Sequence, residues 1–97
     1  MRIVWSPLAI QRLIEAARYI AQDNPEAAES WAEGLFARIE RLSAFPRSGR
    51  IVRERGREDT REVIYEKHRI VYRVDATRVL VLTVRNARRL LDLGELE

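Results

Sequence analysis

The sequence contains no cysteine and a single histidine, His68, among its 97 residues. The lack of cysteine excludes a disulfide scaffold, a thiolate nucleophile and a cysteine zinc site. A lone histidine excludes the Ser-His-Asp and H-E-x-x-H patterns unless His68 acts almost alone. The four glycines are scattered and match no nucleotide-binding fingerprint. We therefore expect neither a metal nor a cofactor.

The chain also lacks long apolar runs. None approaches the length of about 18 residues that a transmembrane helix needs. The opening residues, M-R-I-V-W-S-P, do not have the charged-then-apolar layout of a secretory signal. Hydrophobic residues make up 46% of the chain and charged residues 34%, which fits a soluble globular domain. We expect one domain spanning residues 1–97, located in the cytoplasm and without membrane contact.

The positive charge is concentrated in the second half of the chain. The formal net charge is +3, and all but one of the 18 basic residues are arginine. Residues 1–44 hold five cations and six anions, whereas residues 45–97 hold thirteen cations and nine anions. This basic half is either an ion-paired, solvated surface or a contact surface for an acidic or anionic partner.

Two pairs of a capping residue and a proline predict the starts of two helices. Ser6-Pro7 and Asn24-Pro25 each place a side chain that can cap free backbone amides before a proline suited to the first helical turn. Apolar residues then recur at helical spacing over residues 10–21 and 28–42. Phe45-Pro46 ends the second helix. The short connection of about three residues predicts an antiparallel helical hairpin.

The remaining segments read as strands. Residues 61–66, 69–74 and 78–84 are rich in β-branched and aromatic residues and are separated by turn-length gaps. The last of them is apolar on both faces and is expected to be the most buried. Residues 2–5 predict an N-terminal strand at or near the sheet edge, and Ile51–Arg53 a short one. The predicted fold is α+β, in the order β-α-α-β-β-β-β: a helical hairpin packed on a small, mostly antiparallel sheet, followed by a short C-terminal tail or helix.

The strand-forming half combines arginines with tyrosines. Strand alternation puts Arg69 and Arg73 on one face and Tyr72 on the other, so the first face is either solvated or a binding surface. Arginine, lysine and tyrosine can support RNA cleavage without histidine, so these residues alone leave a ribonuclease open. Tyr65 and Tyr72 are more typical of core or cross-strand packing. His68, in a predicted hairpin turn, is expected to be exposed.

Several short segments together resemble the ParE/RelE superfamily of toxins from type II toxin–antitoxin modules. The resemblance covers nearly the whole chain and implies the same fold. It is carried by W-S-P-L-A at 5–9, Y-I-A-Q-D-N-P-E-A-A at 19–28, L-S-A-F-P-R-S-G-R at 42–50, R-E-V-I-Y at 61–65, H-R-I-V-Y-R-V at 68–74 and R-N-A-R-R at 85–89.

The two branches of this superfamily imply different functions. The N-P-x-A-A and F-P-x-x-G-R segments resemble the ParE branch, which is similar to poisons of DNA gyrase. The RelE branch is similar to ribosome-dependent mRNA endonucleases, which use cations on the sheet and a tyrosine near the C-terminus. For that chemistry the resemblance points to Arg61, Arg69 and Arg88. The tyrosine is missing here, and Leu93 stands at about its place.

The leading hypothesis is therefore a ParE-like toxin, of the kind found in plasmid stabilisation, that inhibits growth by binding gyrase and is not an enzyme. The alternatives are a RelE-like endonuclease acting at the ribosome and a non-toxic member that only binds its partner. The resemblance implies a cognate antitoxin in a hetero-oligomer, with operator DNA contacted through the antitoxin. The candidates for target binding combine cations with apolar residues near the chain end: Arg85, Arg88, Arg89, Leu90 and Leu91. The two leucines could instead pack back onto the helical hairpin.

Overall fold

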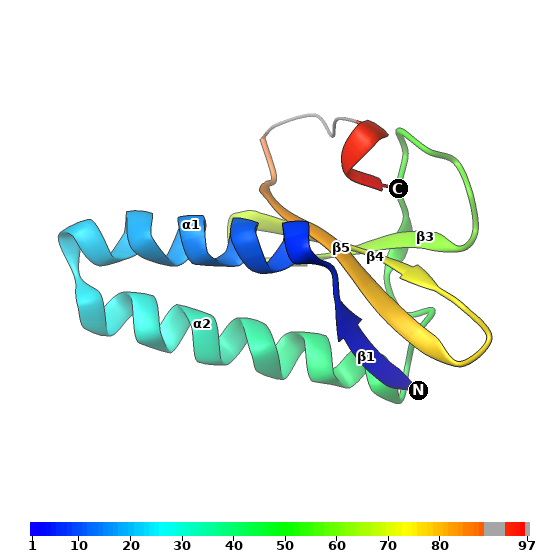
Figure 1. Cartoon of the computed structure of the whole chain (residues 1–97), viewed down its shortest axis with the longest axis horizontal. Coiled ribbons are helices and arrows are strands. Elements are labelled where there is room, and N and C mark those ends of the chain that lie inside the picture. The colour runs from blue at the N-terminus through cyan, green and yellow to red at the C-terminus, as the bar shows by residue number, and fades with distance from the viewer. Residues whose placement is uncertain (89–92, 97) are drawn as a thin grey trace.

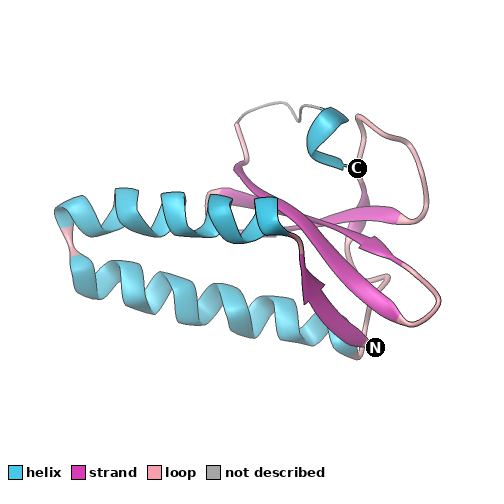
Figure 2. Ribbon diagram, in the orientation of Figure 1, coloured by secondary structure: helices cyan, strands magenta, loops and turns pink. Residues whose placement is uncertain are grey.

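The computed structural model describes residues 1–88 and 93–96 of the chain. Figures 1 and 2 show a helical hairpin beside a sheet. The elements are β1 (Arg2–Trp5), α1 (Pro7–Asp23), α2 (Pro25–Glu40), a 3₁₀ turn (Arg41–Ser43), β2 (Arg50–Ile51), β3 (Thr60–Tyr65), β4 (His68–Val74), β5 (Arg78–Asn86) and a C-terminal 3₁₀ turn (Leu93–Leu96). This order confirms the predicted α+β class.

The five strands form one sheet in the order β1-β5-β4-β3-β2. β1 runs parallel to β5, with Trp5 opposite Val81, and the other neighbours pair antiparallel. The expected edge position of the N-terminal strand is therefore confirmed. Parallel neighbours need a long crossover, and here the helical hairpin and three further strands lie between them in sequence.

Both helices begin where the sequence predicts. The Ser6 Oγ accepts a hydrogen bond from the Ala9 amide at 3.0 Å, and the Asn24 Oδ1 accepts one from the Ala27 amide at 3.2 Å. The Ser6 hydroxyl also donates to the Leu82 carbonyl at 2.9 Å, which ties the start of α1 to β5. From this anchored end the hairpin runs outward, and its loop end extends beyond the sheet (Figure 1).

The helices bury an apolar core against one face of the sheet. Leu35 and Ile39 of α2 are almost completely buried, as are Ile70 and Tyr72 of β4. Burying a large apolar side chain contributes about 1.5–3 kcal/mol, so this face supplies most of the hydrophobic stabilisation. The packing role expected for Tyr72 is confirmed.

The other face of the sheet carries a smaller apolar cluster. Val52, Val71, Leu82 and Leu96 are buried together there. Figure 1 shows the C-terminal turn (red) beside the loop between β2 and β3 (green), and Leu96 and Val52 bring these two segments into this cluster. The face that alternation assigns to arginines is therefore partly covered by the chain itself.

Three local predictions need correction or refinement. The strand predicted at Ile51–Arg53 is Arg50–Ile51, because Val52 turns into the second cluster. His68 is not an exposed turn residue: it begins β4, opposite Tyr65, and is half-buried against Trp31. The stretch predicted to be most buried, residues 79–84, is indeed buried apart from the half-buried Leu80, although β4 is the central strand.

No helix in the part of the chain described here is long and apolar enough to cross a membrane.

Candidate functional site

Arg69 lies at the centre of a buried ion-pair network on the second face of the sheet. Its Nη1 and Nη2 donate to the two carboxylate oxygens of Glu54 at 2.8 and 2.9 Å. Its Nε and Nη2 donate to Glu62 at 2.5 and 3.2 Å. The hydrogen bonds that Arg69 donates to the Glu54 carboxylate, followed by those that it donates to Glu62, raise the pKa of Arg69 against the opposing effect of burial. Arg69 is only 7% exposed, so its positive charge is neutralised inside the molecule.

The hollow over this network has a volume of about 330 Å³. Its lining mixes both signs of charge, with Arg50 and Arg53 beside Glu54 and Glu62. Arg50 also donates to the nearly fully buried Glu62 at 3.0 Å. An anion that binds Arg50 or Arg69 in this hollow would have to displace the carboxylates that already hold them, so these two arginines are poorly placed to bind phosphate.

Arg61 is held by backbone carbonyl groups rather than by carboxylates. Its Nε donates to the Glu58 carbonyl at 3.0 Å, and its Nη1 donates to the Gly49 carbonyl at 2.9 Å and, more weakly, to the Arg47 carbonyl at 3.4 Å. The guanidinium thus fastens the segment before β2 to the start of β3.

The C-terminal turn is fastened to the sheet by Glu95, which is 8% exposed. Its Oε1 accepts hydrogen bonds from the Arg12 Nε at 3.1 Å and the Thr83 Oγ1 at 3.3 Å. Its other carboxylate oxygen pairs with Arg85. The predicted target-binding residue Arg85 is therefore half-buried and ion-paired within the chain.

Of the other predicted target-binding residues, Arg88 lies within the described part of the chain. Arg88 is exposed, and its backbone amide donates to the Asn86 Oδ1 at 2.9 Å. Arg89, Leu90 and Leu91 lie outside the described residues. The three arginines predicted together for a nuclease lie in different environments. Arg69 is buried and Arg61 partly buried, both in structural contacts, whereas Arg88 is exposed.

The tyrosine side chains that could transfer protons in catalysis are engaged in packing instead. The Tyr72 hydroxyl is fully buried and accepts a hydrogen bond from the Gly49 amide at 2.9 Å, and the Tyr65 hydroxyl donates to the Trp31 carbonyl at 3.2 Å. Burial raises the pKa of both tyrosines and lowers the pKa of His68. Within residues 1–88 and 93–96, no cluster of histidine and carboxylate side chains is placed to hold a metal ion.

Sequence reasoning missed the acidic partners of these arginines. Glu54 and Glu62 pair with Arg69, and Glu95 pairs with Arg12 and Arg85; none of these pairs was predicted. The available signal was alternation in β3, which puts Glu62 opposite Val71 and therefore near Arg69 on the second face. Glu95 gave no comparable signal because it lies 83 residues from Arg12.

The fold and this site define a small α+β domain whose arginine-rich sheet is largely ion-paired from within. The family described as the ParE toxin of the type II toxin–antitoxin system parDE matches residues 3–91. The protein named "Putative toxin Y4kP" of Sinorhizobium fredii (strain NBRC 101917 / NGR234) is 33% identical over 90 residues, which cover 91% of this chain and 90% of that protein. The chain therefore belongs to the ParE family of toxins of type II toxin–antitoxin systems.

A solved structure has the same fold. The chain from the chromosomal ParDE TA system of P. aeruginosa superposes with a TM-score of 0.73. The match covers 89% of this chain and 95% of that chain, at 18% sequence identity.

Proposed function

We propose that this ParE-family toxin acts in the cytoplasm by binding DNA gyrase and blocking replication, and that it is not an enzyme. The observation that carries the proposal is the state of the sheet arginines. Arg69 is neutralised by two carboxylates, and Arg61 is bound to backbone carbonyls. A phosphoryl-transfer site needs cations free to stabilise developing charge on the substrate. These two arginines are occupied by the fold instead.

The tyrosine side chains are equally poorly placed for proton transfer in catalysis. A general acid or base must reach the substrate within hydrogen-bond distance and titrate near the working pH. Tyr72 is buried, and the Tyr65 hydroxyl is held by the Trp31 carbonyl. Leu93, at the place where the RelE branch carries a tyrosine, is an exposed apolar residue. These features favour a binding poison over the alternative of a ribosome-dependent endonuclease.

The target-binding surface is proposed to lie at and beyond the end of β5. Arg85, Arg88, Arg89, Leu90 and Leu91 are its candidate residues. In this arrangement Arg85 is the positioning residue, because its ion pair with Glu95 ties β5 to the C-terminal turn. Arg88, which is exposed, would contact the target directly.

The partner is proposed to be a cognate antitoxin that binds the toxin in a hetero-oligomer and contacts operator DNA on its behalf. Supporting this, the outer side of the helical hairpin has a shallow apolar groove of about 330 Å³, lined by residues that include Ile14, Ala17 and Ala32. Ile14 is 43% exposed. An amphipathic helix could bury its apolar face on such a surface.

The test is a pair of assays on the purified protein. DNA supercoiling by gyrase should be inhibited, and the R88A variant should inhibit less at equal concentration. Cleavage of ribosome-bound mRNA should be absent. Intact supercoiling together with cut mRNA would establish the endonuclease instead. If neither effect appears and expression without the antitoxin leaves growth unchanged, the chain is a non-toxic binding member.

A further inference from the structure

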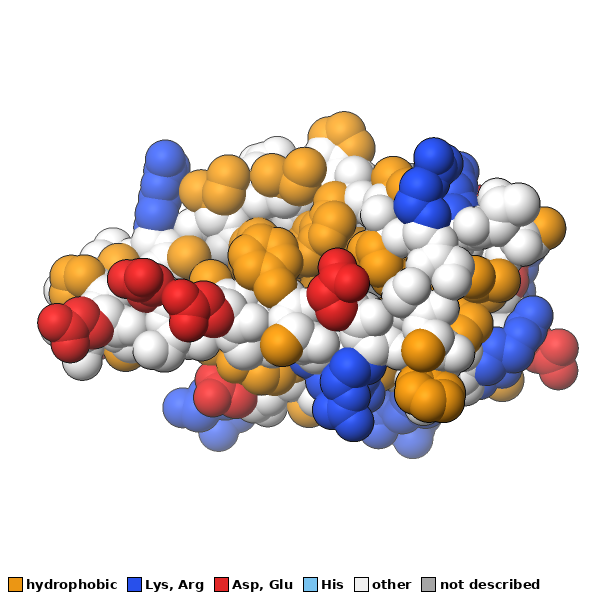
Figure 3. Space-filling view, turned by 90° about the horizontal axis from the view of Figure 1, so that it is seen from below, with side chains coloured by type: hydrophobic (Ala, Val, Ile, Leu, Met, Phe, Trp, Pro, Cys, Tyr) orange, Lys and Arg blue, Asp and Glu red, His pale blue; other side chains and the backbone are white. Residues whose placement is uncertain are grey.

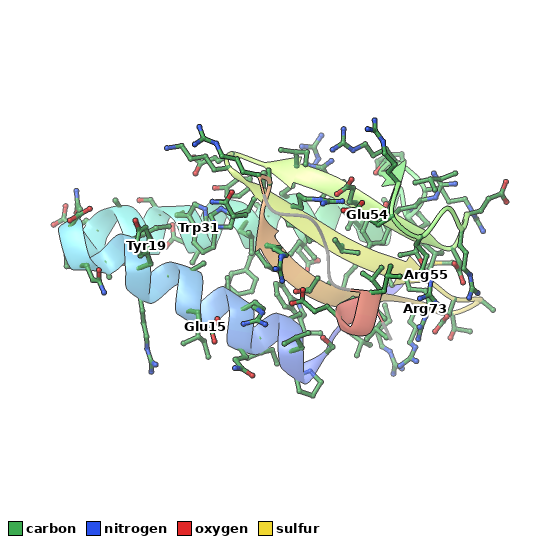
Figure 4. The ribbon with its side chains drawn as sticks, turned by 90° about the horizontal axis from the view of Figure 1, so that it is seen from above. Glu15, Tyr19, Trp31, Glu54, Arg55 and Arg73 are labelled. Carbon is green, nitrogen blue, oxygen red and sulfur yellow. The ribbon has the colours of Figure 1, made fainter. Side chains whose placement is uncertain are left out.

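A hollow of about 670 Å³ lies on the helix-covered side of the sheet, and the ion-pair network lies on the other face. His68, which lines the hollow, directly precedes Arg69 of the network. The hollow opens between the loop end of the helical hairpin and the turn joining β3 to β4, and its lining is mainly apolar. Tyr19 from α1, Trp31 from α2, and Tyr65 and His68 from the strands contribute their rings. In Figure 4, Tyr19 and Trp31 lie near each other on the two neighbouring helices. We call this hollow the aromatic cavity.

Most of these rings are held in place by packing. Trp31 is 5% exposed, and its ring centroid lies 5.1 Å from that of His68 and 6.3 Å from that of Tyr65. The hydrogen bond from the Tyr65 hydroxyl to the Trp31 carbonyl fixes the pair further. Tyr19 differs, since it is 75% exposed. The aromatic cavity thus combines three packed rings with one exposed ring, that of Tyr19.

The loop end of the helical hairpin, which forms one side of the aromatic cavity, is acidic, although the protein as a whole is basic. Residues 19–37 contain Asp23, Glu26, Glu29 and Glu33 and no lysine or arginine. All four carboxylates are exposed, and Figure 3 shows acidic side chains gathered toward the loop end of the hairpin.

The rim of the aromatic cavity adds one charge of each sign, Glu66 and Lys67, both exposed. The His68 ring does not add to the positive charge near neutral pH, because burial lowers its pKa.

We propose that the aromatic cavity receives an arginine side chain presented by a segment of a partner protein. Cations bind over the faces of aromatic rings, and arginine does so most often because its planar guanidinium also stacks. The apolar lining suits the aliphatic stem of such a side chain. The surrounding carboxylates attract a cation and repel phosphate, which disfavours a nucleic acid as the occupant.

This proposal rests on the proposed function only in naming the antitoxin as the protein that carries the segment. The contact would lie between the acidic loop end of the hairpin and the turn joining β3 to β4, and it would favour a cation.

The test uses short capped peptides and the two tryptophans as reporters. A pentapeptide with a central arginine between alanines is titrated into the full chain, and the indole N–H resonances of Trp31 and Trp5 are followed by NMR. Trp31 should shift in a saturable manner. Trp5, which packs against Phe36 and does not line the aromatic cavity, should remain unchanged. The matched peptide with citrulline has the same shape without the charge and should bind at least about threefold more weakly.

Neutralising either charge at the rim gives predictions of opposite sign. Glu66→Gln should weaken the arginine peptide, whereas Lys67→Gln should tighten it, each by about two- to fivefold at low salt. Both side chains are exposed, so the fold should tolerate either change. Tyr19→Leu removes one ring and should weaken binding by about threefold. Phe45→Leu is its matched control, since Phe45 is 67% exposed and lies outside the aromatic cavity.

Several results would overturn the proposal. Equal affinity for the arginine and citrulline peptides would reduce the site to a simple apolar pocket. Weaker binding in Lys67→Gln, or parallel shifts of both tryptophans, would remove the charge argument. A Trp31 shift that depends on protein concentration without peptide would assign the aromatic cavity to a second copy of this chain. None of these readouts involves gyrase or growth, so they are independent of the toxicity assays.

Discussion

The two faces of the sheet are stabilised in different ways. The face under α1 and α2 is closed by apolar side chains from both helices and three strands. Among the described residues, the apolar cluster on the other face has four buried members, and buried charged groups lie on the same face. Glu62, Arg69 and Glu95 are each at most 8% exposed. A basic sequence half therefore need not be a basic surface, because part of its charge is cancelled inside the fold.

The strongest test of this difference is the loss of the central cation of the second face. Arg69→Met should destabilise the protein by about 3–5 kcal/mol, because it leaves the buried Glu62 and the half-buried Glu54 without their shared partner. Urea unfolding followed by circular dichroism measures the change. The matched control is Arg73→Met. Arg73 is half-buried and lies 3.8 Å from Asp75, so its loss should cost less than about 1 kcal/mol. Equal losses of stability in the two variants would contradict a buried ion-pair network around Arg69.

A cavity in the helix-covered face should come next in size. Leu35→Ala removes a side chain with no exposed surface and should cost about 2–5 kcal/mol. The same unfolding experiment applies, and a crystal structure of the variant would show how far the core collapses. Leu93→Ala, at a residue that is 51% exposed, should change stability by less than about 0.5 kcal/mol. A small effect at Leu35 would contradict the assignment of the main core to this face.

The attachment of the C-terminal turn predicts a smaller, more local effect. Glu95→Gln weakens the contacts with Arg12, Thr83 and Arg85 and should cost about 1–3 kcal/mol. Amide hydrogen exchange should become faster at Val52 and Leu82 while the helix-covered core stays protected. Glu15→Gln removes the exposed partner of Arg12 and should cost less than about 0.5 kcal/mol. Uniformly faster exchange would show that the turn is not a separate unit.

The smallest expected effect is a pH dependence at His68. Burial lowers its pKa in the folded state below the ordinary value of 6.5. The unfolded chain therefore takes up a proton first as the pH falls, and the free energy of unfolding should decrease between about pH 7 and pH 5.5. Thermal unfolding across this range measures the slope, and His68→Gln should flatten it. An unchanged slope in the variant would assign the dependence to other groups.

Local rules predicted the fold well. Ser6 and Asn24 cap the helices as expected, and the alternation around Tyr72 gives the correct core face. The ion pairs of Arg69 and Arg85 could not be predicted in the same way. They depend on which segments cover the second face, and that choice is made by packing that brings Leu96 and Val52, distant in sequence, into one cluster. The aromatic cavity could not be predicted for the same reason, since its rings come from three separate parts of the sequence.

The parallel pairing of β1 with β5 also has a consequence for synthesis. The partner of Val4 is Leu80, and that of Trp5 is Val81, so the sheet cannot close until most of the chain has left the ribosome. Pairing between distant segments is slow because loop closure precedes any stabilising contact. The nascent chain would therefore be unable to present a folded toxin until β5 has been made. An antitoxin already present would meet the molecule at the moment it folds.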